Sequence, residues 1–215
     1  MNDSQKQGLT QPKKLVLFDD YNKTQLSLIV NDNKFLLENH TGKEHFNSKL
    51  SNYKIIYLPI NNLSTINKVE NLKEKLLINL KSQYSDKSLH ELSFEEFIDF
   101  KADDEEKDLL LHMNNETKRI KKIKEAIITN DYQTLTKLIN QANYSLKNLV
   151  LNLTQRQEQV IIFSYACDSL ATKIINLGFI FLVETKKTNQ FINKFRKLYN
   201  DFYGTNIDLI ELITV

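Results

Sequence analysis

Short runs rich in apolar and β-branched residues, bounded by Asn, Asp, Gly or Pro, recur toward both ends of the chain. Runs of this length and composition are typical of β-strands. They cover residues 14–19, 25–30, 53–58, 171–175, 179–183 and 207–215. Pro59 follows the third run and ends it, because proline cannot donate to a strand ladder.

Between these runs, apolar residues recur three and four positions apart, which predicts helices with one buried face. Two of these helices begin with a capping box, in which a hydroxyl side chain and the residue three positions later satisfy free backbone N–H groups. The predicted helices cover residues 66–80, a short segment after Ser93, residues 105–129, a segment from Asp131, residues 155–167 and a segment after Thr188. Strands interrupted by hairpins and helices favour an α+β fold, with an antiparallel or mixed sheet and helices packed on one face.

Composition changes this picture little. The chain has 215 residues, 41% hydrophobic and 26% charged, which is ordinary for a globular protein with a real core. Its 29 basic and 27 acidic residues give a net charge of +2, so no large field of one sign favours nucleic acid. We therefore expect no nucleic-acid partner.

The single cysteine, Cys167, excludes an intramolecular disulfide and fits a reducing compartment. No cluster of Cys and His has the spacing of metal ligands, so no metal site is predicted. No apolar run reaches the roughly 20 residues of a membrane span, and the first residues lack the apolar stretch of a signal peptide. We expect a cytoplasmic protein with no membrane partner.

Four blocks in the middle of the chain carry a resemblance to a known family. Residues 88–97 (SLHELSFEEF) resemble "SLRDVTLEEF", and residues 112–120 (HMNNETKRI) resemble "HVVTENERV". Residues 126–131 (AIITND) and 138–146 (LINQANYSL) then resemble "AL..GD" and "LMNESHYSL". These motifs occur in this order in the carboxy-terminal half of galactokinases, in the GHMP sugar-kinase superfamily. The resemblance implies a GHMP-kinase carboxy-terminal-like domain.

The same resemblance extends toward both ends. Residues 170–179 (LATKIINLGF) are similar to the family's "LGARMTGGGFGG", with Lys173 at the arginine position and Gly178 and Phe179 retaining "GF". Near the start, Asp3 matches the aspartate that the family implies as catalytic base; the alternative is an acidic residue in a frayed terminus. Asn67 is the residue retained where the sugar-contact motif "YNERR" belongs, which implies a substrate contact.

Other parts of the family pattern are absent from these 215 residues. No glycine- and serine-rich loop resembles "PxGxGLSSSA", whose backbone N–H groups would hold ATP phosphates at a helix amino terminus. Phosphoryl transfer depends on positioning and charge stabilisation, so we expect the isolated chain to be inactive and to use no cofactor. We expect residues 1–65 to be a remnant of the inter-domain strand region and residues 66–215 to be the carboxy-terminal-like domain.

Three functional hypotheses stay open at this point. The first is a pseudokinase or binding module, with a sugar as a possible ligand. The second is one part of a split galactokinase, which transfers the ATP γ-phosphate to the C1 hydroxyl of galactose when a complementary amino-terminal chain supplies ATP and Mg²⁺. The third is an eroded gene product. A split enzyme would gain stability and activity from its partner, whereas a binding module would be stable alone.

Remaining charged residues have ordinary structural interpretations. His40, His45, His90 and His112 are scattered and are interpreted as surface or structural residues rather than catalytic ones. The basic stretch 118–124 has isoleucines three apart and fits the solvent face of a helix better than a phosphate site. The acidic residues 103–106 precede a helix and fit stabilisation of its amino end better than cation binding.

Overall fold

A computed structural model describes residues 14–19, 24–30, 32, 34–39, 41–48, 51–60, 64–85, 87, 91–149, 153–175 and 178–212. The strands are β1 (Lys14–Asp19), β2 (Gln25–Ile29), β3 (Lys34–Asn39), β4 (Gly42–Asn47), β5 (Tyr53–Pro59), β6 (Ala171–Ile175), β7 (Gly178–Glu184) and β8 (Ile210–Leu212). The α-helices are α1 (Ser64–Gln83), α2 (Phe94–Asp99), α3 (Asp104–Thr129), α4 (Tyr132–Leu149), α5 (Gln155–Ala166) and α6 (Thr188–Tyr203), and a 3₁₀ turn, η2, spans Thr185–Lys187.

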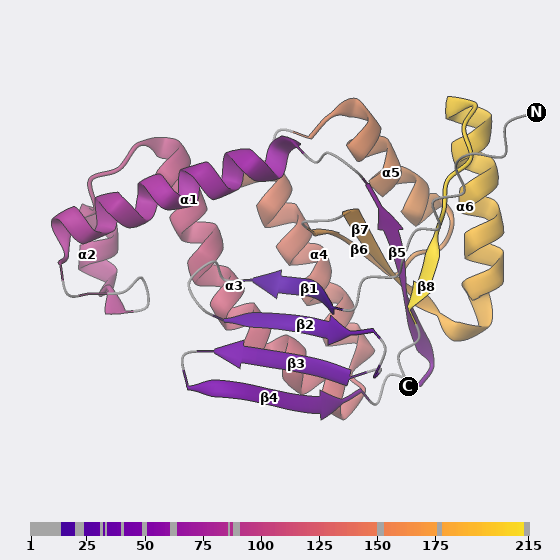
Figure 1. Cartoon of the computed structure of the whole chain (residues 1–215), viewed down its shortest axis with the longest axis horizontal. Helices are drawn as coiled ribbons and strands as arrows, with labels where there is room; N and C mark the ends of the chain where they lie inside the picture. Colours follow the sequence, from indigo (N-terminus) through magenta and orange to yellow (C-terminus); the bar gives the residue numbers. More distant parts are fainter. Residues whose placement is uncertain are drawn as a thin grey trace, which may run out of the picture.

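The strands form two antiparallel sheets of four strands each (Figure 1). The first sheet follows chain order, β1-β2-β3-β4, and the long helices α3 and α4 run behind it. The second sheet has the order β6-β7-β5-β8, and α5 and α6 lie beside it. The α+β class with antiparallel sheets and packed helices is therefore confirmed.

The pattern of apolar and polar residues predicted most of these elements, but it did not predict β3 and β4. Strand β4 is largely exposed and polar, so it lacks the apolar run by which strands are recognised. A side chain closes the hairpin that joins it to β3: the Asn39 carboxamide oxygen accepts from the backbone N–H groups of Thr41 at 2.9 Å and Gly42 at 3.1 Å. Such Asn-stabilised turns depend on local hydrogen bonding rather than on hydrophobic periodicity.

The core has two parts, separated by the second sheet. One part lies between the first sheet, α3, α4 and one face of the second sheet; the other lies between the opposite face and the helices α1, α5 and α6. Helix α3 belongs to both, with Met113 in one part and Ile120 in the other. Strand β5 pairs with both β7 and β8, so it joins the first sixty residues to the end of the chain. The division at residue 65 stays a prediction.

Gly178, at the start of β7, is required by close packing against β5. It has φ +147°, and a Cβ built on it would lie 1.9 Å from the backbone oxygen of Leu58. Gly42 has a similar φ of +144°, but a Cβ there would meet nothing within 4 Å. Substitutions at these two positions therefore distinguish the cost of backbone strain from the cost of a steric clash.

We predict that Gly178→Ala lowers the free energy of unfolding by about 3 kcal/mol or more, because strain and overpacking add. Gly42→Ala, the matched control, should cost about 1–2 kcal/mol from strain alone. Urea denaturation of both variants measures the difference. Equal losses for the two variants would show that the β5–β7 contact does not require glycine.

Candidate functional site

An acidic residue occupies the buried stripe of α3. Leu109, Met113, Ile120 and Ile123 are buried at helical spacing, and Glu116 takes the position between Met113 and Ile120 with only 1% exposure. Carboxylates are almost never fully buried unless they are paired. A charged residue at an apolar position of the helical pattern is therefore the signal in the sequence that indicates this site.

Glu116 is paired with two cations. Its Oε1 accepts from Arg119 Nη1 at 2.7 Å, and its Oε2 lies 3.4 Å from Lys173 Nζ. Lys173 comes from β6, is 5% exposed, and places its ammonium 4.5 Å from the centroid of the Phe18 ring. A bulge in β1, where Leu17 has no partner in β2, turns both Leu17 and Phe18 into the core and so brings this ring to Lys173.

Burial and pairing act on these groups in opposite directions. Burial lowers the pKa of Lys173 from its ordinary value, although the Glu116 carboxylate opposes the shift. For Glu116, burial alone favours the neutral acid, but Lys173, His112 and Arg119 outweigh it and hold the pKa below its ordinary value. The salt bridge between Glu116 and Lys173 lies inside the core, with 3.4 Å between Oε2 and Nζ.

His112, one turn before Glu116 on α3, is also buried. Its Nδ1 lies 2.9 Å from Ser145 Oγ on α4, and burial lowers the pKa of this imidazole to about 4, with Lys173 and Arg119 adding to the shift and Glu116 opposing it. His112 is therefore neutral at pH 7. This agrees with a structural interpretation of His112.

Two asparagines of α4 hold the outer edge of β6. Asn143 Oδ1 accepts from Ile174 N at 3.1 Å, and Asn140 Oδ1 accepts from Thr172 N at 3.4 Å. These N–H groups lie on the side of β6 away from β7, where an edge strand exposes unpaired donors. The asparagines thus fix α4 against the strand that carries Lys173.

Three of the blocks that carry the family resemblance meet here. His112, Glu116 and Arg119 belong to residues 112–120, Asn140, Asn143 and Ser145 belong to residues 138–146, and Lys173 belongs to residues 170–179. Segments far apart in the sequence are joined by buried hydrogen bonds and ion pairs. We name the set His112, Glu116, Arg119, Ser145 and Lys173 the buried polar cluster.

Two other predicted site residues, Gly178 and Phe179, lie outside this cluster. Phe179 is fully buried in the part of the core on the α5–α6 side and stacks with Phe181, at 6.5 Å between ring centroids. Gly178 packs against β5, as described above. Asn67 lies in the first turn of α1, and Asp3 lies outside the described residues.

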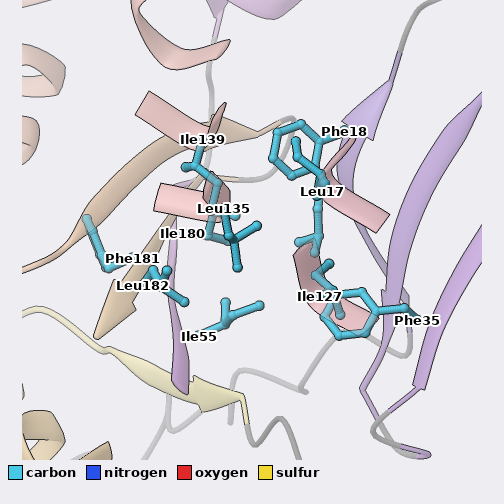
Figure 2. Close-up of a pocket in the computed structure, with 11 residues that line it drawn as sticks. Leu17, Phe18, Phe35, Ile55, Ile127, Leu135, Ile139, Ile180, Phe181 and Leu182 are labelled. Atoms are coloured by element: carbon cyan, nitrogen blue, oxygen red, sulfur yellow. The ribbon is translucent and has the colours of Figure 1, made fainter. Parts of the chain in front are cut away.

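A small cavity of about 20 Å³ lies in the core between the two sheets. Figure 2 shows Phe18 and Phe35 from the first sheet facing Leu135, Ile180 and Ile55 across it. Every residue that lines it is apolar. Such a cavity stays dry and offers no group for acid–base or nucleophilic chemistry, so it is a packing feature.

Among the described residues, no group of three His, Cys, Asp or Glu side chains could hold a metal ion. Among the described helices, none combines the length and apolar character needed to cross a membrane.

Comparisons with known proteins agree with the geometry at the level of the fold. No protein-family model matches the sequence, and no curated protein matches it. Among solved structures, Lactococcus lactis galactokinase complexed with galactose superposes with a TM-score of 0.67 at 19% identity, covering 90% of this chain and 51% of that one. L. major mevalonate kinase in complex with R-mevalonate superposes with a TM-score of 0.51 at 10% identity, covering 84% and 49%.

The chain has a GHMP-kinase-like fold. It spans about half the length of these two kinases. In this GHMP-kinase-like fold, the buried polar cluster connects α3, α4 and β6, and it is the main concentration of buried charge found in the described residues.

We predict that Glu116→Leu lowers the free energy of unfolding by about 3–5 kcal/mol, because it leaves Lys173 buried without its partner. The double variant Glu116→Leu/Lys173→Met should recover more than half of this loss, since no unpaired buried charge remains between them. Double-mutant cycles from urea denaturation measure the coupling.

The exposed ion pair Lys147–Glu158, 3.1 Å apart, is the matched control, and its removal should change stability by less than about 1 kcal/mol. A cycle in which the buried pair shows no more coupling than this surface pair would contradict the assignment.

We further predict a loss of stability in mild acid that depends on His112. The pKa of His112 lies at about 4 in the folded chain, below the ordinary 6.5, so the unfolded chain binds more protons between these values. Stability therefore falls as pH falls through this window, by about 2 kcal/mol between pH 7.5 and 5.

Urea denaturation of His112→Gln at both pH values should show that this part of the pH dependence is gone. His45→Gln, on exposed β4, should keep it. If both variants keep the wild-type pH dependence, His112 is not its source.

Proposed function

We propose that these 215 residues form a GHMP-kinase-like binding module, or pseudokinase, that does not transfer phosphate by itself. The observation that supports this most directly is the structural role of the three residues retained from the glycine motif, Lys173, Gly178 and Phe179. Lys173 is ion-paired and buried, Gly178 accommodates the Leu58 carbonyl, and Phe179 lies in the core. Each retained residue has a role in packing, and all three are buried.

The missing phosphate loop supports the same proposal. The sequence contains only four glycines, which stand too far apart to form a phosphate-binding loop. Backbone N–H groups of such a loop bind the phosphates and hold them in position for phosphoryl transfer. The ligand class that we propose for the module is a sugar, since L. lactis galactokinase, the more similar of the two kinases, was solved complexed with galactose.

We predict that the purified chain forms no galactose 1-phosphate from galactose and ATP-Mg²⁺, and that ATP-Mg²⁺ alone does not raise its melting temperature. A ligand that binds only the folded state must raise that temperature, so the titration reports binding directly. L. lactis galactokinase under the same conditions is the positive control. Phosphorylated product from the chain alone would contradict the proposal.

A split galactokinase is the second candidate, and one observation favours it. The superposition covers 90% of this chain but only 51% of the L. lactis enzyme. The other half of such an enzyme has no counterpart in these residues. In this case a complementary amino-terminal kinase chain brings ATP and Mg²⁺, and Asp3 acts as the catalytic base. Asn67 then contacts the sugar.

Co-expression with the amino-terminal half of L. lactis galactokinase tests this candidate. If the chain is part of a split enzyme, galactose 1-phosphate should form only with the co-expressed pair. The Asp3→Asn variant of the pair should lose that product. A pair that co-purifies without forming product, or an Asp3→Asn pair that retains activity, would count against it.

A further inference from the structure

An open groove of about 780 Å³ lies between α3 and α4, on the solvent side of the buried polar cluster. Asn115 and Arg119 reach it from α3, four residues apart, and Lys137, Gln141 and Tyr144 reach it from α4 at spacings of four and three. These spacings place each set on a single helix face, so the two polar stripes lie opposite each other. Its volume is in the range of small-molecule sites.

The floor of the groove is held rigidly. Glu116 fixes the Arg119 guanidinium through one nitrogen at 2.7 Å, and His112 fixes the Ser145 hydroxyl at 2.9 Å. Arg119 makes no further hydrogen bond to a described residue, and its side chain lines the groove. A guanidinium already oriented by a buried carboxylate loses little entropy when it binds an anion.

The exposed side chains at the rim of the groove, in contrast, have no hydrogen-bond or ion-pair partner within the described part of the chain. Lys137 is exposed and makes no ion pair with a described carboxylate, and Tyr144 exposes 72% of its surface. Gln141 and Asn115 add carboxamide donors and acceptors. None of the residues that line the groove is acidic.

We propose that this groove binds a hydroxylated organic anion of monosaccharide size. Arg119 and Lys137 would pair with the anionic group, since a guanidinium and an ammonium both bind phosphate or carboxylate. The carboxamides of Asn115 and Gln141 would accept and donate to hydroxyl groups, and the flat ring of Tyr144 would cover the apolar face of a sugar ring. A sugar phosphate and a sugar acid share this chemistry.

This inference goes beyond the proposed function, because it assigns a ligand to a surface that needs neither ATP nor the glycine motif. The two proposals can also fail separately: the kinase assay reports phosphate transfer, whereas the titrations of the groove variants below report binding at α3 and α4.

The test is a thermal-shift and calorimetric titration of the full chain with glucose 6-phosphate, glucuronate, glucose and inorganic phosphate. We expect saturable binding of at least one sugar anion, and at least tenfold weaker binding of glucose and of inorganic phosphate. The two anions distinguish a sugar phosphate from a sugar acid. Equal binding of inorganic phosphate, or no binding of either sugar anion, overturns the proposal.

Variants locate the site. Lys137→Gln and Tyr144→Ser change exposed side chains and should each weaken binding at least fivefold without changing the melting temperature of the free chain. Lys122→Gln, an exposed residue of α3 that does not line the groove, is the charge-matched control and should bind as the wild type does. Unchanged binding in both groove variants overturns the proposal.

Discussion

The ion pair between Glu116 and Lys173 is the constraint on which the middle of this molecule depends. Both charges lie inside the core, where either one alone would be costly, so α3 and β6 must hold them together. The Phe18 ring and the Arg119 guanidinium complete their surroundings, and Asn140 and Asn143 fix α4 to the same strand. The Glu116 carboxylate of α3 and the two asparagines of α4 therefore hold both helices against β6.

The same constraint gives a packing role to the residues that resemble a kinase motif. A cation at position 173 is needed to neutralise Glu116, and glycine at 178 is needed because β7 approaches the Leu58 carbonyl. Both needs belong to the fold. The resemblance between residues 170–179 and a catalytic segment can therefore persist in a protein that binds but does not phosphorylate, which is the function we propose.

Much of the fold could be predicted from the sequence, because its apolar stripes and capping residues are strong local signals. Ser93 with Glu96 and Thr154 with Gln157 begin α2 and α5 as the capping-box pattern indicates. Strand β4 could not be predicted, because its exposed polar residues depend on pairing with β3. The buried polar cluster was also missed: each member looks like a surface residue by type, and only tertiary packing brings Glu116 to Lys173. The family resemblance identified the sequence segments that meet in the buried polar cluster, but it did not predict the contacts between them.

The most direct test of the account is the reactivity of Lys173 in the native chain, followed by amine-selective labelling and mass spectrometry. The account predicts that Lys173 is labelled only as fast as the whole chain unfolds, that ATP-Mg²⁺ does not change this rate, and that exposed lysines such as Lys122 react rapidly. Rapid labelling of Lys173 in the folded chain, with protection by ATP-Mg²⁺, would show a lysine that faces a nucleotide and would contradict the account.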